Sequence, residues 1–234
     1  RNEYRSEMLG ILTQLAQGKQ DEALRSAKVL RENWPDRADA HGLVGAIEFA
    51  SGDSEAARIS FNQGLKVKPD EVNIIRYLAQ LDIAEDNPQD AQDRYLVILE
   101  LDPDDSSAMI SLARLAAGSE DHVAAREWLE KARESNPSSV TARSLLAAWY
   151  LAFRDFDKAE EVAKEAVSLN PNSAKLHNYL GLAQHYDENY RDAVFSFGRA
   201  AELEPDEPSY RLNLARSQSA QGNVASALVS LEDS

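Results

Sequence analysis

The chain has 234 residues, of which 43 % are hydrophobic, enough for a continuous core. Its 25 Lys and Arg residues against 40 Asp and Glu residues give a formal net charge of −15, which argues against nucleic-acid partners and anionic membrane surfaces. There is no cysteine, so disulfides and thiolate chemistry are excluded, and no apolar run approaches the ~20 residues that a membrane-spanning helix needs, so we expect no membrane insertion.

Proline and alanine each recur along the chain at one spacing of 34 residues. The prolines are Pro35, Pro69, Pro103, Pro137, Pro171 and Pro205. The alanines are Ala23, Ala57, Ala91, Ala125, Ala159, Ala193 and Ala227. A fixed period of this size indicates stacked supersecondary repeats, and it accommodates two helices of about a dozen residues with two short turns. The sequence therefore predicts an all-α solenoid of about seven helix pairs, in which each repeat contacts only its neighbours.

The repeats follow one another without a linker from residue 4 to residue 234, so we expect a single array. Taken in chain order they are 4–37, 38–71, 72–105, 106–139, 140–173, 174–207 and a truncated 208–234. The recurring proline ends the second helix of its repeat, since proline cannot continue a helix. Pro88 and Pro208 fall in first turns, where the missing N–H is harmless.

Two columns of capping residues mark the helix starts. For the first helices, the residues that directly follow the recurring prolines are predicted N-caps: Asp36, Asp70, Asp104, Ser138, Asn172 and Asp206. For the second helices, the predicted N-caps are Asp53, Asn87, Asp121, Asp155, Asn189 and Asn223, and only the first repeat departs, with Lys19. Two start signals per repeat predict thirteen or fourteen helices.

Small residues at facing positions predict where the two helices of a repeat approach closely. The second helix supplies the alanine column, and the first helix supplies a matching column: Gly45, Ala79, Ala113, Ala147, Gly181 and Ala215. Larger residues surround this contact, among them Phe61 and Phe197 in the second helices.

These residues resemble the tetratricopeptide repeat family. Repeat 38–71 matches the family pattern with Gly45, Gly52-Asp53, Ala57, Phe61 and Pro69. Repeat 174–207 matches it with Leu180-Gly181, Asn189-Tyr190, Ala193, Phe197, Ala200 and Pro205. The resemblance implies a right-handed superhelix in which the first helices line a concave groove and the second helices form the outer wall. It also implies the role of a peptide-binding scaffold.

The stretch from Ser111 to Leu151 is also similar in style, though not through a diagnostic motif, to bacterial envelope lipoproteins that accompany exosortase protein-sorting systems. That similarity slightly favours the cell envelope or periplasm over the cytoplasm, while the compartment itself stays open. The chain begins at Arg1 without a methionine and ends at Ser234 inside an expected helix, so we expect it to be a segment of a longer protein.

The resemblance also predicts which side chains line the groove, because inward positions recur in the first helices of the family. The groove candidates are Arg76, Tyr77, Gln80, Arg114, Asn178, Tyr179, His185, Tyr186, Asn213 and Arg216. Guanidinium groups can hold a carboxylate bidentately, and Tyr and Asn can bind an extended backbone without demanding a sequence. Some family members bind the C-terminal tails of chaperones through a carboxylate clamp of Lys, Asn and Arg side chains. That clamp is incomplete here, because Ser111 stands where asparagine is needed.

Nothing in the sequence points to catalysis or to a cofactor. His41 and His177 share one repeat position that normally packs, so core histidines are favoured over metal ligands. There is no phosphate-binding glycine loop, no HExxH spacing and no serine-nucleophile elbow. We therefore expect a non-enzymatic scaffold that binds a protein or peptide and neither metal nor cofactor. Its exposed terminal helices would allow self-association.

Two alternatives stay open at this point. One is an envelope factor for assembly, secretion or exopolysaccharide export that organises several partners. The other is the regulatory arm of a larger enzyme.

Overall fold

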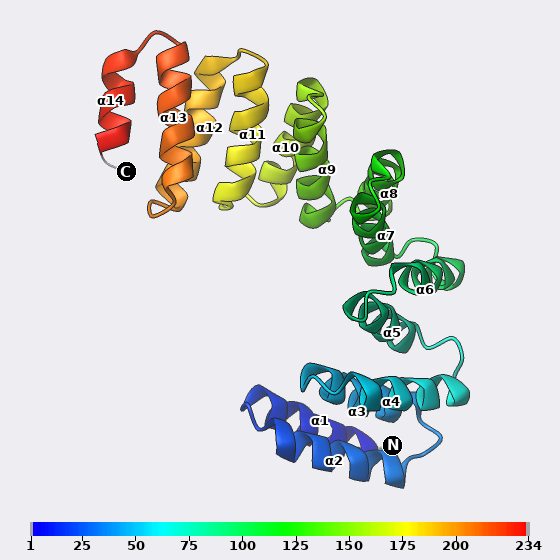
Figure 1. Cartoon of the computed structure of the whole chain (residues 1–234). Helices are drawn as coiled ribbons and strands as arrows, with labels where there is room; N and C mark the ends of the chain where they lie inside the picture. The colour runs from blue at the N-terminus through cyan, green and yellow to red at the C-terminus, as the bar shows by residue number, and fades with distance from the viewer. Residues whose placement is uncertain (1, 233–234) are drawn as a thin grey trace. The chain divides into compact units, whose positions relative to one another are not determined.

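The computed structural model describes residues 2–232, which form fourteen α-helices and no strand (Figure 1). In chain order the helices are α1 (Asn2–Ala16), α2 (Gln20–Asn33), α3 (Ala38–Ala50), α4 (Ser54–Val67), α5 (Val72–Ala84), α6 (Pro88–Leu101), α7 (Ser106–Gly118), α8 (His122–Ser135), α9 (Val140–Ala152), α10 (Phe156–Leu169), α11 (Ala174–Tyr186), α12 (Tyr190–Leu203), α13 (Pro208–Ala220) and α14 (Val224–Glu232). Each odd-numbered helix is the first helix of a predicted repeat and each even-numbered helix is the second. The all-α, helix-turn-helix solenoid is confirmed.

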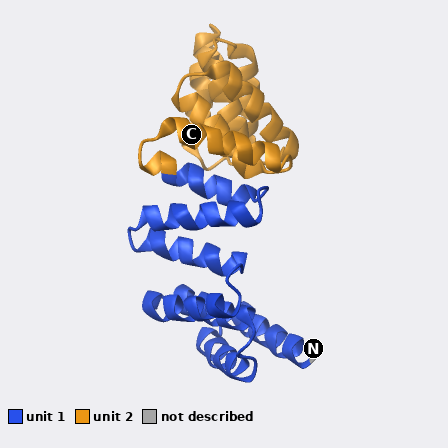
Figure 2. Cartoon of the chain, turned by 90° about the vertical axis from the view of Figure 1, so that its right-hand side faces the viewer, with its two compact units in different colours: residues 1–115 blue, residues 116–234 orange. Residues whose placement is uncertain are grey.

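The chain divides into two compact units, residues 1–115 and 116–234 (Figure 2). In unit 1 each helix from α1 to α6 packs on the next, and in unit 2 each helix from α8 to α14 does the same. First helices of successive repeats also touch. In unit 1, α3 contacts α5, and in unit 2, α11 contacts both α9 and α13. The exposed side of these odd-numbered helices is called the first-helix face below. One continuous array over residues 4–234 stays a prediction.

The two helices of every repeat are joined through a residue with left-handed backbone. These residues are spaced by 34 and comprise three glycines and four other residues: Gly18, Gly52, Asp86, Glu120, Arg154, Glu188 and Gly222. The following residue then occupies the N-cap position of the second helix. The side chains of Asp53, Asp121, Asp155 and Asn223 accept a backbone N–H there, as predicted, whereas those of Asn87 and Asn189 do not. In repeat 38–71 the N–H of Asp53 donates to the carbonyl of Glu48 (3.0 Å) and its carboxylate accepts from the N–H of Ala56 (3.1 Å). This reversal is the Schellman motif, which satisfies the last carbonyls of the first helix.

The predicted caps of the first helices were wrong by one residue. Pro35 and Asp36 are the central residues of a tight turn, closed by the N–H of Arg37 donating to the carbonyl of Trp34 at 3.2 Å. Arg37, with φ −110° and ψ 107°, is the residue that adopts the extended backbone of an N-cap. The same turn recurs after the other five prolines, so the caps are Arg37, Glu71, Asp105, Ser139, Ser173 and Glu207. Proline's fixed φ suits the second position of such a turn, which explains the displacement.

Both columns of small residues are buried within their repeats. All seven alanines of the second-helix column are buried, none more than 6 % exposed. Where the facing residue is glycine, a phenylalanine ring fills the space. A Cβ added to Gly45 would lie 2.6 Å from the ring of Phe61, and one added to Gly181 would lie 2.7 Å from the ring of Phe197. Both rings are almost fully buried, so neither can move aside.

Two equivalent repeats each pair a buried hydroxyl with a polar side chain of the first helix. In repeat 38–71 the hydroxyl of Ser60 donates to Glu48 (2.7 Å), and in repeat 174–207 the hydroxyl of Ser196 donates to Gln184 (2.7 Å). His41 and His177 lie in the core, as predicted. Each places Nε2 2.9 Å from the carbonyl of the preceding recurring proline, which fastens one repeat to the next.

Candidate partner-binding surfaces

A cavity of about 370 Å³ opens on the first-helix face of unit 1. Three of the predicted groove residues, Arg76, Tyr77 and Gln80, lie together in its wall. The remaining lining comes from α1, α3, α5 and the loop before α5: Met8, Asp39, Gly42, Leu43, Ala46, Glu71, Asn73 and Ile74. The cavity therefore draws on the first helices of three successive repeats.

Small residues on α3 create the space in this cavity. A Cβ added to Gly42 would lie 3.1 Å from the side chain of Ile74, so the glycine leaves room at this point of the wall. Ala46, one turn further along α3, is also small. Tyr77 forms an apolar wall and is held in place by stacking on Phe61, with ring centroids 5.3 Å apart and 7° between the planes. The sequence reading missed Met8, Leu43 and Ala46, although they occupy the same repeat positions as the predicted polar residues.

Arg76 is held in an ion pair. Its guanidinium donates to the carboxylate of Asp105, and the same carboxylate accepts the N–H of Ala108 (2.8 Å) and caps α7. Burial would raise the pKa of Asp105, but these hydrogen bonds outweigh burial and hold the pKa below its usual value. Arg76 thus braces the start of the next repeat. Arg114 lies exposed on α7 and is not part of the cavity wall.

Three of the six predicted groove residues of unit 2 take part in contacts between α11 and α13. The side-chain amide of Asn213 donates to the amide oxygen of Asn178 at 3.0 Å. Nδ1 of His185 lies 2.9 Å from the hydroxyl of Ser217. Within α11, the ammonium nitrogen of Lys175 lies 5.5 Å from the centroid of the Tyr179 ring. The structure therefore brings these side chains onto one surface.

Arg216, another of these candidates, is exposed beside His185 on this surface. Burial is the main cause that lowers the pKa of His185, and the positive charge of Arg216 lowers it further. Both effects favour the neutral form of the imidazole. Tyr186, also predicted to face the groove, is 53 % exposed and stacks on Phe156 with centroids 5.2 Å apart.

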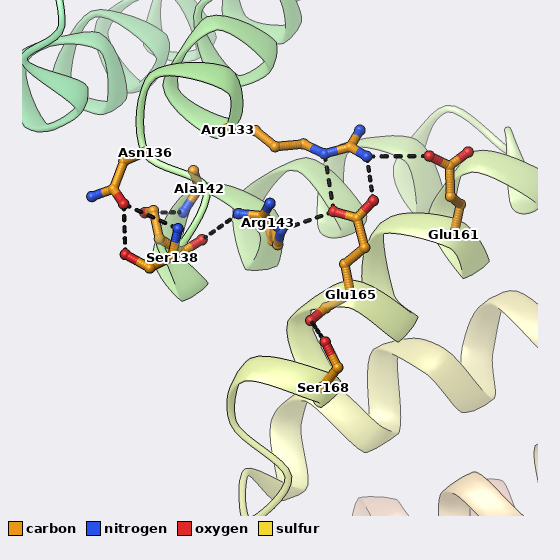
Figure 3. Close-up of polar contacts among 9 residues, drawn as sticks. Arg133, Asn136, Ser138, Ala142, Arg143, Glu161, Glu165 and Ser168 are labelled. Atoms are coloured by element: carbon orange, nitrogen blue, oxygen red, sulfur yellow. Dashed lines mark hydrogen bonds and ion pairs between the residues drawn. The ribbon is translucent and has the colours of Figure 1, made fainter.

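A second polar cluster lies between α8, α9 and α10 (Figure 3). Arg133 and Arg143 converge on the carboxylate of Glu165, with Nε–Oε2 distances of 3.1 Å and 2.8 Å. Arg143 is only 8 % exposed and also donates to the carbonyl of Ser139 at 3.2 Å. Burial would raise the pKa of Glu165, but the two guanidinium groups outweigh it and hold the pKa below its usual value.

This cluster lines a cavity of about 660 Å³, and its ion pairs tie three helices together. Sequence reasoning missed it, because the paired residues are 32 and 22 positions apart. One signal was present: Arg143 occupies the repeat position of the buried His41 and His177. With both arginines bound to Glu165, the cluster serves to join helices.

None of the described helices is long and apolar enough to cross a membrane.

Solved structures similar to this chain are helical repeat proteins. A tetratricopeptide repeat protein from Parabacteroides merdae has 17 % identity and a TM-score of 0.66, with 99 % of this chain and 92 % of that chain covered. PilF from Pseudomonas aeruginosa has 18 % identity and a TM-score of 0.66, with 83 % and 90 % covered. MamA from Desulfovibrio magneticus has 20 % identity and a TM-score of 0.63, with 70 % and 92 % covered. At these identities the likeness concerns the fold alone.

No curated protein sequence matches the chain. The similarity to exosortase-associated lipoproteins is not shown by these comparisons and stays a prediction.

Family models give a direct assignment. One tetratricopeptide repeat model matches residues 11–71, 78–140 and 185–234, and a second matches residues 116–183. The first of these models alone covers more than half of the chain. The chain therefore belongs to the tetratricopeptide repeat family, whose repeats generally serve as scaffolds for protein–protein interaction.

Proposed function

We propose that this protein is a non-enzymatic scaffold that binds an extended segment of a partner protein on its first-helix faces. The observation that carries the proposal is the unit 1 cavity, where α1, α3 and α5 together form one wall. Proteins of this fold are typically non-enzymatic scaffolds. A similar structure, YrrB, with 16 % identity and a TM-score of 0.61 over 77 % of this chain and 93 % of its own, is described as having an unusual peptide-binding site.

The cavity suits one apolar side chain of such a segment. Leu43, Tyr77 and Ala46 supply apolar contact, and about 370 Å³ is in the range of small binding pockets. Gln80 and Asn73 are exposed at the cavity and can hydrogen-bond a peptide backbone. Because the first helices are fixed by core packing, the segment loses entropy on docking while the scaffold loses little.

A random-peptide library selected against the whole protein tests this proposal. Selected peptides should bind wild type and the outer-face variant Ile59→Glu alike, since Ile59 is exposed on α4. Leu43→Glu should weaken them about tenfold or more, because it puts a charge into the cavity. Binding is measured by calorimetry, and the melting curve of each variant confirms that it is folded.

Gln80→Trp provides a second cavity variant that leaves the core untouched, because Gln80 is exposed. Its large ring should fill the cavity mouth and weaken the same peptides. Peptides that bind both cavity variants as tightly as wild type would contradict the proposal. The envelope-assembly and enzyme-regulation alternatives, together with self-association, stay predictions.

A further inference from the structure

Acidic residues are absent from the first helices of unit 2. The chain has 40 Asp and Glu residues, yet α9, α11 and α13 contain none. The second helix α10 alone carries four: Asp157, Glu160, Glu161 and Glu165. The negative charge of unit 2 is therefore confined to its second helices and loops, and its first helices are the part of it without carboxylates. Glu207, which precedes α13, is exposed at the N-cap of that helix.

Two exposed cations lie on that face. Lys175 is in the first turn of α11, and Arg216 is in the middle of α13. Arg143, by contrast, is buried against Glu165 and unavailable to a partner. Lys175 and Arg216 therefore give the α11–α13 surface a positive charge within a protein whose formal net charge is −15.

The amide pair Asn178–Asn213 lies on the same two helices, one turn from each cation. Its internal bond uses the nitrogen of Asn213 and the oxygen of Asn178. Within the described residues, no other protein group bonds the remaining nitrogen of Asn178 or the remaining oxygen of Asn213. One free donor and one free acceptor are the complement of a peptide group in an extended chain.

We propose that the first-helix face of unit 2 binds an acidic peptide segment. Its carboxylates pair with Lys175 and Arg216, and its backbone bonds the amides of Asn178 and Asn213. This inference rests on the proposed function and specifies the class of partner that this face selects. A partner with basic side chains is disfavoured, because α11 and α13 carry no carboxylate and present two like charges.

A nucleic acid is the weaker occupant, although it too is anionic. Every nucleotide brings a phosphate charge, and the net charge of −15 repels such a chain as a whole. The face presents only two exposed cations, which suits a peptide with a few spaced carboxylates. An oligonucleotide is therefore included as a competing probe in the experiment.

Three synthetic decapeptides of one design test the inference. They alternate alanine with glutamate, glutamine or lysine and carry one fluorescent label, and fluorescence anisotropy measures their binding to the whole protein. The glutamate peptide should bind about tenfold more tightly than the glutamine peptide at low salt, and this advantage should shrink as salt screens the charges. The lysine peptide should bind this face most weakly.

Charge reversal locates the site. The double variant Lys175→Glu/Arg216→Glu should abolish the preference for glutamate over glutamine. The matched control Lys164→Glu/Arg191→Glu makes the same change in net charge at exposed positions of α10 and α12, and it should leave the preference within about twofold of wild type. The control thereby separates local pairing from long-range attraction.

His185 gives an independent spectroscopic signal. Arg216 faces it from α13, Ser217 bonds it, and the rings of Tyr186 and Tyr190 pack against it at 5.5 Å and 5.4 Å. A bound carboxylate beside Arg216 should offset that positive charge and raise the pKa of His185. An NMR titration of the imidazole with and without the glutamate peptide measures the change.

Several outcomes would overturn the inference. One is equal affinity for the glutamate and glutamine peptides. Another is an equal loss of the glutamate preference in Lys175→Glu/Arg216→Glu and in the control Lys164→Glu/Arg191→Glu. A third is tighter binding of a ten-nucleotide single-stranded DNA than of the glutamate peptide. If library peptides depend on the unit 1 cavity while the glutamate and glutamine peptides bind equally well, the inference is overturned and the proposed function stands. Library peptides that bind Leu43→Glu and Gln80→Trp as tightly as wild type would instead count against the proposed function.

Discussion

Repeat 38–71 of unit 1 and repeat 174–207 of unit 2 have nearly the same interior. Each has a histidine bonded to the preceding proline carbonyl, a glycine facing a phenylalanine, and a serine bonded to a polar residue of the first helix. The matching residues are His41 and His177, Gly45 and Gly181, Ser60 and Ser196, and Phe61 and Phe197. The interior of a repeat is thus fixed by packing and hydrogen bonding.

Their first-helix faces differ at every corresponding position. Where α3 presents Asp39, Gly42, Leu43 and Ala46, α11 presents Lys175, Asn178, Tyr179 and Leu182. The first set is small and apolar around an acidic residue and forms a cavity, whereas the second is larger, polar and basic. The comparison teaches that one interior can carry two different surfaces, because the interior contacts that the two repeats share do not involve these four positions of the first helix.

The largest effect should come from removing the phenylalanine in either repeat. Phe61→Ala and Phe197→Ala each remove a fully buried ring, which typically lowers the free energy of unfolding by about 3–5 kcal/mol. Urea denaturation followed by circular dichroism measures the loss. If one substitution proved nearly harmless and the other severe, the two interiors would not be equivalent.

Adding one methyl group at the facing glycines should have an intermediate effect. Gly45→Ala and Gly181→Ala place a Cβ within 2.6–2.7 Å of a buried ring, and overpacking of this kind costs about 1–3 kcal/mol. Gly198→Ala is the control, because nothing lies within 4 Å of its Cβ, and it should stabilise α12 by up to about 1 kcal/mol. Gly45→Ala and Gly181→Ala should therefore lower the melting temperature, and Gly198→Ala should raise it.

Substitutions at the left-handed position of the turn between the two helices should change stability in opposite directions in the two repeats. Gly52 has φ 83° and Glu188 has φ 62°, a region that is unfavourable for residues with a Cβ. Gly52→Ala should therefore destabilise the protein by about 1 kcal/mol, and Glu188→Gly should stabilise it by a similar or smaller amount. Equal signs for the two changes in denaturation midpoint would show that turn strain is not the controlling term.

The smallest effect on stability should come from changing the exposed face. Lys175→Asp gives α11 the residue that α3 has at this position, and exposed substitutions usually change stability by less than about 0.5 kcal/mol. The variant should melt near wild type while it loses preference for the glutamate peptide. A large drop in melting temperature would mean that Lys175 supports the fold as well as the surface.

The sequence predicted the helices because proline, alanine and capping residues repeat at a spacing that local chemistry explains. The caps of the first helices were displaced because the residue after each proline enters a turn before the helix begins. Of the four groove candidates in unit 1, Arg76, Tyr77 and Gln80 share a cavity and Arg114 does not line it, and their role in binding stays a prediction. Their pairing was not predictable, because the Arg76–Asp105 contact joins residues 29 positions apart. Repeat position specifies the side a residue faces, and only the three-dimensional structure specifies its neighbour.

The glycine–phenylalanine pairs limit how such an array can diverge after duplication. A single substitution at Gly181 produces a clash, and a single substitution at Phe197 produces a void, so either step alone weakens the repeat. Repeats with alanine at the first position already carry a tyrosine, leucine or alanine opposite it, as at Ala79 and Tyr95, Ala113 and Leu129, and Ala147 and Ala163. Among related chains, the two positions should therefore change together, and an alanine in place of Gly181 should be accompanied by a residue other than phenylalanine at position 197.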